Sequence, residues 1–245
     1  MNGESPGNPS GGAAAVPDSR LYPDLIRAGS LAGALRAAAA EGGLDLGEVT
    51  PSAESAEARY KTARVAAERA VVEVRLGLGE RRFSVTLDDR RRHLVWASGS
   101  TGELDVVARS AAAWREGAGL RDLAREFPYL RPKRAALALE DERLTDSQWE
   151  ALLSDGRHAG HHALLARLRA TAGVCEAYPY FSHETLRLTV DFFDRSAREV
   201  LIDSHEDGTY TLRGPAEGET AVAGDLDALV RRVVDTGVFR PRTDR

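Results

Sequence analysis

The sequence contains a single cysteine, and it lacks any long apolar run. Cys175 is that cysteine among 245 residues, which excludes an intrachain disulfide and a zinc site built from several cysteines. No apolar run approaches the ~20 residues that a membrane-spanning helix needs. Residues 1–10 are too polar to begin a signal peptide. We therefore expect a cytoplasmic protein that does not associate with membranes.

Strong positive charge is also absent. The chain has 33 basic and 38 acidic residues, a formal net charge of −5, and only two of the basic residues are lysine. Basic residues cluster only at 90–93 and 131–134, and the first cluster follows Asp88 and Asp89, which predicts a self-neutralised turn. Nucleic-acid-binding domains usually carry a basic stripe. We therefore expect no nucleic-acid partner.

The established sequence motifs of catalysis are missing as well. The chain has no GxSxG elbow, no GxGxxG loop and no HExxH motif. A glycine-rich segment at residues 98–102 precedes an expected helix and could bind phosphate through backbone N–H groups, but no lysine follows it. Ser100 and Glu103 stand three apart, which instead predicts a capping box, and Thr145 with Gln148 repeats that spacing.

Three histidines form the best apparent metal cluster. His158 and His162 would be neighbours on one helix face and could share an ion with His161 nearby. No carboxylate stands at the spacing that would supply a further ligand. We therefore interpret these histidines as exposed side chains, and we expect neither a bound metal nor a cofactor. Cys175 has no catalytic context and is interpreted as buried filler.

The fold class follows from two stretches of period-two alternation. Strict alternation predicts strands with one packed and one wet face, as in an antiparallel meander. The first stretch predicts strands at residues 72–78, 83–87 and 94–96, then a helix from Leu104. The second predicts strands at residues 186–192, 200–202 and 210–212, a loop at 215–224, and a helix from Leu226. We expect an α+β protein with a helical region between two meander-plus-helix units.

The two stretches share one plan, which is consistent with a duplication. Leu186 follows Val72 by 114 residues, and Leu226 follows Leu104 by 122 residues. The alternative is coincidence, because a meander followed by a helix is a common arrangement. Either origin leaves the same expected units.

The expected organisation has four parts. Residues 1–19 form a disordered tail, residues 20–130 hold helices and the first unit, residues 131–238 hold the helical connector and the second unit, and residues 239–245 form a polar tail. Within the first unit we expect a helix over 31–41 capped by Ser30, and an alanine-rich helix from Thr50-Pro51 to about Ala67.

The segment from Tyr178 to Leu186 is the best candidate for a site. Five of the fifteen aromatic residues lie between Tyr178 and Phe193, and His183 lies among them. A histidine beside tyrosine hydroxyls in a desolvated pocket could act as an acid or base. Alternatively, the rings pack a helix–strand corner and His183 makes a local hydrogen bond. The candidate ligand-binding residues are Tyr178, Tyr180, Ser182, His183 and Arg187.

The distance between His183 and Arg187 suits a binding role. In an extended chain they would lie on one face about 13 Å apart, at ~3.3 Å per residue. That span suits the two ends of a ligand or peptide better than one catalytic pair.

Several short strings resemble an actinobacterial family described as natural product biosynthesis proteins. They are Ala28-Gly29-Ser30-Leu31, Trp96–Thr101, Val107–Trp114 with Phe127-Pro128, and Tyr178–Leu186. The resemblance extends from about residue 21 to 236 and rests on small-residue and aromatic patterns. It departs from the family at Leu188-Thr189, where Phe-Ser is expected. The resemblance implies a biosynthetic gene-cluster context and carries over no catalytic residue.

Two functions from different classes remain. The first is a binding or accessory protein that recognises a peptide, an intermediate or a partner protein of a biosynthetic pathway, supported by half-exposed sheets with edge strands. The second is a cofactor-free tailoring enzyme that uses His183 as acid or base.

Overall fold

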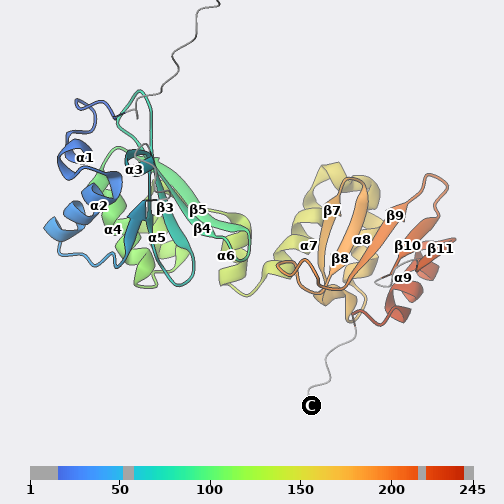
Figure 1. Ribbon diagram of the computed structural model, residues 1–245. Helices are drawn as coiled ribbons and strands as arrows, with labels where there is room; N and C mark the ends of the chain where they lie inside the picture. The colour runs from blue at the N-terminus through green and yellow to red at the C-terminus, as the bar shows by residue number, and fades with distance from the viewer. Residues whose placement is uncertain (1–15, 52–57, 215–218, 240–245) are drawn as a thin grey trace, which may run out of the picture. The chain divides into compact units, whose positions relative to one another are not determined.

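The computed structural model describes residues 16–51, 58–214 and 219–239, and it shows an α+β protein with two antiparallel sheets (Figure 1). Contacts divide the chain into Met1–Lys133 and Arg134–Arg245, so each unit is described by itself. Residues 1–15 of the predicted tail at 1–19, and residues 240–245 of the predicted tail at 239–245, lie outside the described residues. Within that description, every helix is too short or too polar to span a lipid bilayer.

The first unit begins with two short helices, α1 (Pro23–Ala28) and α2 (Leu31–Glu41). Gly29 separates them at φ +73°, a left-handed conformation that glycine adopts without strain. The Ser30 hydroxyl then accepts a hydrogen bond of 2.9 Å from the Gly33 N–H. This cap confirms the predicted start of the helix over residues 31–41.

Six strands form the sheet of the first unit in chain order. They are β1 (Val49–Pro51), β2 (Thr62–Val65), β3 (Val71–Leu76), β4 (Phe83–Asp89), β5 (Leu94–Thr101) and β6 (Leu130–Pro132). The remaining helices are α3 (Ala58–Lys61), α4 (Leu104–Arg115) and α5 (Leu120–Glu126).

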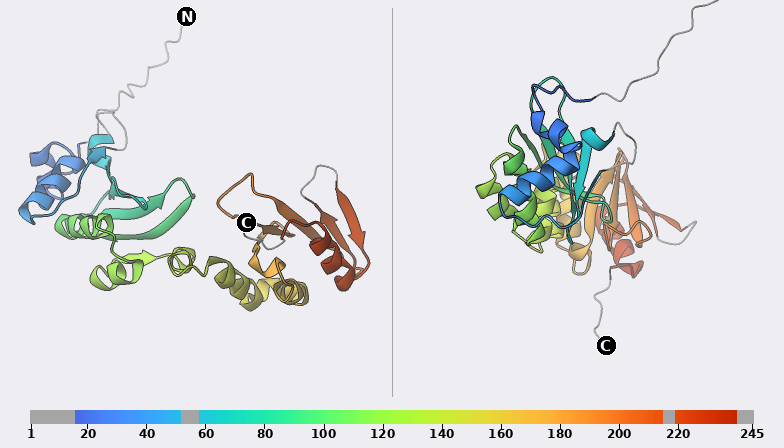
Figure 2. Two further views of the ribbon diagram at one scale, coloured as in Figure 1. Left: turned by 90° about the horizontal axis from the view of Figure 1, so that it is seen from below. Right: turned by 60° about the vertical axis from the view of Figure 1, so that its left-hand side comes forward.

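One face of this sheet packs against α2 and α4, and its alternating residues form the core (Figure 2). Val72, Leu87 and Ala97 lie in one cross-strand row of that face and are almost fully buried. Trp114 of α4 adds a hydrogen bond of 2.9 Å from its indole N–H to the Ala70 carbonyl. The core therefore joins the predicted strands to the predicted helix from Leu104.

The predicted alanine-rich helix from residue 50 to 67 is wrong. Residues 49–51 and 62–65 are strands, and only Ala58–Lys61 is helical in the described part of that span. Ala63 and Val65 are fully buried opposite Val74 and Val72 of β3. The small side chain of Ala63 fits where α2 packs on β2, so tertiary pairing overrides the helical preference of alanine.

The predicted glycine-rich loop at residues 98–102 is also wrong, because β5 continues through Thr101. Ser98 and Gly99 pair with Arg131 and Leu130 of β6. The Ser100–Glu103 capping box does not form: the N-cap residue Glu103 makes no side-chain cap bond, and its N–H donates to the Thr101 hydroxyl. The pairing of β5 with β6, which is distant in the sequence, therefore explains the extended conformation of residues 98–101.

The second unit places its helices before its sheet. They are α6 (Arg134–Glu140), α7 (Leu144–Ser154), the 3-10 turn η1 (Gly156–His161), α8 (His162–Arg169) and a second 3-10 turn η2 (Val174–Glu176). Five strands follow in a meander: β7 (Tyr178–Ser182), β8 (Thr185–Thr189), β9 (Glu199–Ser204), β10 (Tyr210–Arg213) and β11 (Thr220–Ala223). The last helix is α9 (Leu226–Asp235), which Asp225 caps through the Ala228 N–H.

A second apolar core joins these helices to one face of the sheet. Trp149, Leu165 and Leu168 from the helices pack with Leu188 and Ile202 from the strands. Phe239, which sequence analysis placed in a polar tail, is 9% exposed and belongs to this core. The Thr145–Gln148 capping box is wrong as well, since α7 begins at Leu144 and its N-cap is Arg143.

The strand order does not confirm an exact duplication. The expected loop at residues 215–224 contains β11, which precedes α9 in the chain. The strand at the corresponding sheet position of the first unit is β6, and it follows α4 and α5. Both units thus contain an antiparallel meander, but the edge strand follows the helices α4 and α5 in the first unit and precedes the helix α9 in the second.

Candidate binding surface on the second sheet

The pairing of β7 with β8 brings most of the predicted ligand-binding residues to one face. Tyr178, Tyr180 and Ser182 lie opposite Thr189, Arg187 and Thr185. Pro179 and Phe181 occupy the alternate positions and therefore point to the helix-covered face. We call the other face the tyrosine face; its residues on β7 to β10 are Tyr178, Tyr180, Ser182, Thr185, Arg187, Thr189, Glu199, Leu201, Asp203, Thr211 and Arg213.

Glu199 of β9 joins the central residues of the tyrosine face. The Tyr180 hydroxyl donates to one carboxylate oxygen at 3.2 Å, and Arg187 Nη1 donates to the other at 2.9 Å. Burial raises the pKa of Tyr180; the negative charge of Glu199 raises it further, while Arg187 partly opposes the rise. Tyr180 therefore remains a protonated hydrogen-bond donor at neutral pH.

A second polar group extends the tyrosine face toward β10. The Thr185 hydroxyl and Arg213 Nη2 both donate to the Asp203 carboxylate, at 2.5 and 2.8 Å. Each carboxylate on this face is thus paired with an arginine. Such pairing neutralises each carboxylate, while its hydrogen bonds can still be exchanged for bonds to a partner's polar groups.

Aromatic side chains border the polar centre. Phe192, from the segment between β8 and β9, lies 4.4 Å from the Tyr178 ring and 5.8 Å from the Tyr180 ring. Tyr178 is buried beneath it, whereas Phe192 is 45% exposed and Val190 is 46% exposed. An exposed aromatic side chain therefore packs on Tyr180, whose hydroxyl bonds Glu199 of the Arg187–Glu199 pair.

His183 does not join this face. It lies exposed at φ +57° in the two-residue turn between β7 and β8, together with Glu184. The predicted extended span from His183 to Arg187 is wrong, because the chain reverses at this turn. The Tyr180 hydroxyl bonds Glu199, so the predicted pairing of His183 with that hydroxyl is not formed.

Two of the three other candidate histidines pack on Phe181, on the opposite side of the hairpin, whereas His162 Nε2 lies 3.2 Å from the Asp155 carbonyl oxygen. The His158 ring stacks on Phe181 at 4.3 Å, and the His161 ring lies 5.0 Å from it. Burial lowers the pKa of His161, and His158 lowers it further, while Glu184 acts in the opposite direction. The histidines are half-buried, so the prediction of exposed side chains is wrong. Among described residues, no three potential ligands converge on a metal position.

The first unit contains a cavity of about 570 Å³ beside α1, α2 and the start of α4. Arg81 lines it, but this guanidinium already bonds Asp24 and the carbonyls of Leu21 and Gly102. Alanines of α2 form much of the remaining wall. Arg81 is therefore held in a structural ion pair at the wall of this cavity.

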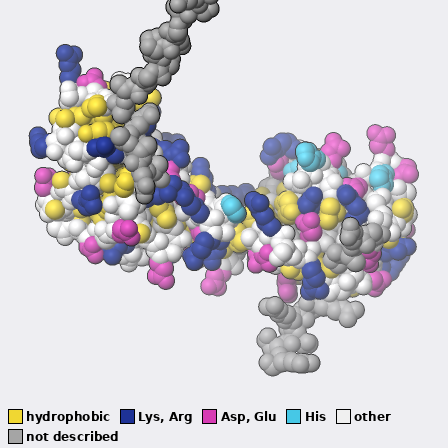
Figure 3. All heavy atoms as spheres, in the orientation of Figure 1, with side chains coloured by type: hydrophobic (Ala, Val, Ile, Leu, Met, Phe, Trp, Pro, Cys, Tyr) yellow, Lys and Arg dark blue, Asp and Glu magenta, His cyan; other side chains and the backbone are white. Residues whose placement is uncertain are grey.

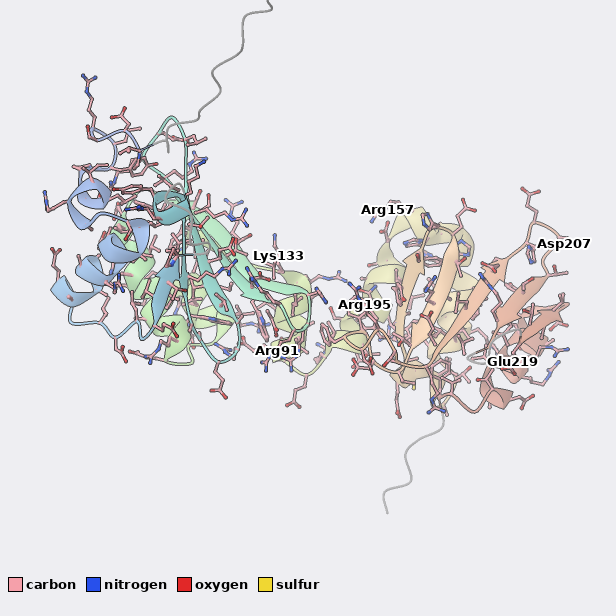
Figure 4. All side chains as sticks on the ribbon, in the orientation of Figure 1. Arg91, Lys133, Arg157, Arg195, Asp207 and Glu219 are labelled. Atoms are coloured by element: carbon pink, nitrogen blue, oxygen red, sulfur yellow. The ribbon has the colours of Figure 1, made fainter. Side chains whose placement is uncertain are left out.

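The tyrosine face has the chemistry of a recognition surface. Tyrosine, phenylalanine and arginine are enriched where proteins bind one another, whereas catalysis needs an acid or base held near a reacting group. Figure 4 shows other charged side chains of this unit, Arg157 and Asp207, reaching into solvent. Neither Glu199 nor Phe192 was predicted as a site residue. Glu199 reaches this face through the pairing of β9 with β8, which alternation alone does not reveal, and Phe192, predicted to lie in a strand over 186–192, follows the end of β8 at Thr189.

Comparison with known proteins adds no relative: no family model matches the chain, and neither a curated protein nor a solved structure is significantly similar to it. The geometry of the tyrosine face is therefore the basis for assigning a function.

Proposed function

We propose that this protein is a non-catalytic binding protein that recognises a peptide or partner protein through the tyrosine face. The observation that carries the proposal is the exposed ring of Phe192 against Tyr178 and Tyr180, where the Tyr180 hydroxyl joins the Arg187–Glu199 pair. From the resemblance noted in the sequence, we propose that the protein serves an actinobacterial natural product pathway as an accessory component.

The arrangement supports recognition for two physical reasons. Aromatic rings bury a large apolar area with little loss of side-chain freedom, and they supply most hot spots of protein interfaces. Arg187 and Glu199 add specificity for the orientation of the partner, because its carboxylate or amide can replace one member of the existing hydrogen-bonded pair. The alternative of a cofactor-free enzyme at His183 has less support, because an exposed turn neither desolvates the imidazole nor holds a second group against it.

Binding is tested with the full chain and a phage-displayed library of random peptides. Peptides enriched on the wild type are measured by fluorescence anisotropy against Phe192→Ala and Arg187→Gln. Both changes are expected to weaken binding about tenfold or more, as for hot-spot residues. Leu78→Ala is the matched control, because Leu78 is an apolar side chain 87% exposed in the first unit.

The pathway context needs a second experiment in the producing organism. The gene is deleted and replaced by the wild type, Phe192→Ala or His183→Ala, and the metabolites are compared by mass spectrometry. We expect His183→Ala to restore the product and Phe192→Ala to fail. If a folded His183→Ala protein loses the product while Phe192→Ala restores it, the binding proposal is wrong and the enzyme alternative stands.

A further inference from the structure

The open face of the first sheet carries a row of polar residues unrelated to the tyrosine face. Strand pairing places Arg64, Glu73, Thr86, Ser98 and Arg131 side by side across five strands. The adjacent row contains Arg75, Ser84 and Ser100. We call these eight residues the arginine face.

A single carboxylate in this row faces three guanidinium groups. Arg75 Nη2 lies 2.6 Å, Arg90 Nη2 3.1 Å and Arg64 Nε 3.4 Å from the Glu73 carboxylate. Burial acts to raise the pKa of Glu73, but the three arginines outweigh it and hold that pKa below its usual value. Glu73 therefore stays ionised, and the surrounding positive charge exceeds its own.

Arg64 lies at one end of the row, with its Nε buried against the Glu73 carboxylate. Arg131 is exposed at the far end of the row, and no ion pair joins it to any residue in the described part of the chain. The hydroxyls of Thr86 and Ser98 lie between these two arginines in the same row.

We propose that the arginine face is a docking surface for an acidic peptide segment of a partner protein. Strands lie about 4.8 Å apart, so β3 and β6 are separated by about 14 Å, a width that accepts one extended chain. Carboxylates of that chain would pair with the exposed guanidinium groups of Arg75 and Arg131, and its polar groups would meet the hydroxyls between them. Basic side chains gather over β3–β5 in the space-filling view (Figure 3).

The composition of the face favours a peptide over a nucleic acid. Single-stranded nucleic acids bind where aromatic rings stack on bases, and none of the eight residues is aromatic. Glu73 at the centre would repel a continuous phosphate backbone, while a peptide can place a neutral residue there. Arg91, in the turn between β4 and β5, and Lys133, directly after β6, are exposed cations outside the row (Figure 4). They extend its positive charge by only a few residues.

The test uses the full chain with three fluorescent probes: a short Glu-rich peptide, the same peptide with Gln at every Glu, and an oligo-dT strand. Affinities are measured by anisotropy at low and physiological salt. Arg131→Gln should weaken binding of the Glu-rich peptide about two- to fivefold, as for an exposed charge pair. Glu73→Gln should strengthen it by a similar factor, because it removes the repelling carboxylate. Melting temperatures establish that each variant is folded.

The matched control is Arg36→Gln, which removes the same charge from an exposed position on α2. The proposal is supported if Arg131→Gln and Glu73→Gln move affinity in opposite directions while Arg36→Gln leaves it unchanged. It is overturned if Arg36→Gln weakens binding as much as Arg131→Gln, or if the Gln peptide binds as tightly as the Glu peptide. Tighter binding of oligo-dT than of the peptide also overturns it. The proposal does not rest on the tyrosine face, because Phe192→Ala is expected to leave these affinities unchanged.

Discussion

Arg81 holds Asp24 through two parallel hydrogen bonds, from Nη1 at 2.9 Å and from Nη2 at 2.8 Å. The same guanidinium donates to the carbonyl oxygens of Leu21 and Gly102. One side chain that precedes β4 thus ties together the entry to α1 and the entry to α4. The pair organises three segments that are distant in the sequence.

The first prediction concerns the pH dependence of this pair. Asp24→Asn keeps the side-chain shape and removes its charge, and it should lower the free energy of unfolding by about 1 kcal/mol at neutral pH, since both side chains are about one-third exposed. Burial acts to raise the pKa of Asp24, but Arg81 outweighs it and the folded-state pKa lies below its usual value. The stabilisation is therefore complete above the unfolded-state pKa of about 4 and is lost as pH falls through the folded-state pKa.

Urea unfolding at a series of pH values from neutral to strongly acidic measures this difference. The gap between wild type and Asp24→Asn should close at the acidic end. Asp122→Asn is the control, because its ion pair with Arg125 is far more exposed. A gap that stays constant at all pH values, or an equal loss in the control, would contradict the interpretation.

The second prediction concerns Trp149, whose buried indole N–H donates to the carbonyl oxygens of Cys175 and Ala177, both at 3.1 Å. These bonds fix the chain immediately before β7. Trp149→Phe keeps an aromatic ring but leaves two carbonyls without this donor, so it should cost about 1–3 kcal/mol of stability beyond the change in packing. Chemical unfolding followed by circular dichroism measures the cost.

Trp96→Phe is the matched control for that experiment. Trp96 is 5% exposed, but its indole N–H has no hydrogen-bond partner within the described structure. Its replacement removes ring volume and no bond, so the loss should be smaller than for Trp149→Phe. Equal losses would show that packing, not hydrogen bonding, accounts for both.

The third prediction concerns Gly99, where β5 pairs with β6. A Cβ at this position would overlap the Tyr129 carbonyl oxygen, which is backbone and cannot rotate away. Gly99→Ala should therefore cost about 1–3 kcal/mol, as for overpacking in a core, and should expose the amides of β6 to hydrogen exchange. Gly160→Ala is the control, because nothing lies within 4 Å of the added methyl group. Matching melting temperatures and intact protection of β6 in both variants would refute the explanation.

The sequence alone located the strands and helices with strong local signals. The helix over Leu31–Glu41 and the strands β3, β4 and β9 match the predictions closely, because capping by Ser30 and alternation at period two act between near neighbours. The strand predicted over residues 186–192 is β8, but it ends at Thr189, and residues 190–192 lie in the segment that follows. The predictions failed for β1 and β2, whose alanines favour a helix when considered without a partner strand. They failed again at β11, where four residues are too few to show a period.

The candidate site was also predictable only in part from the sequence. The aromatic and basic residues of the segment after Tyr178 were recognisable by type, and Tyr178, Tyr180, Ser182 and Arg187 do share one face. The exclusion of His183 depends on a turn at positive φ, and the inclusion of Glu199 and Phe192 depends on which strands pair. Composition and local periodicity are properties of the chain itself, and they determined the α+β class and most elements. Register, and hence which side chains meet on the tyrosine and arginine faces, arises from non-local pairing that only the folded structure decides.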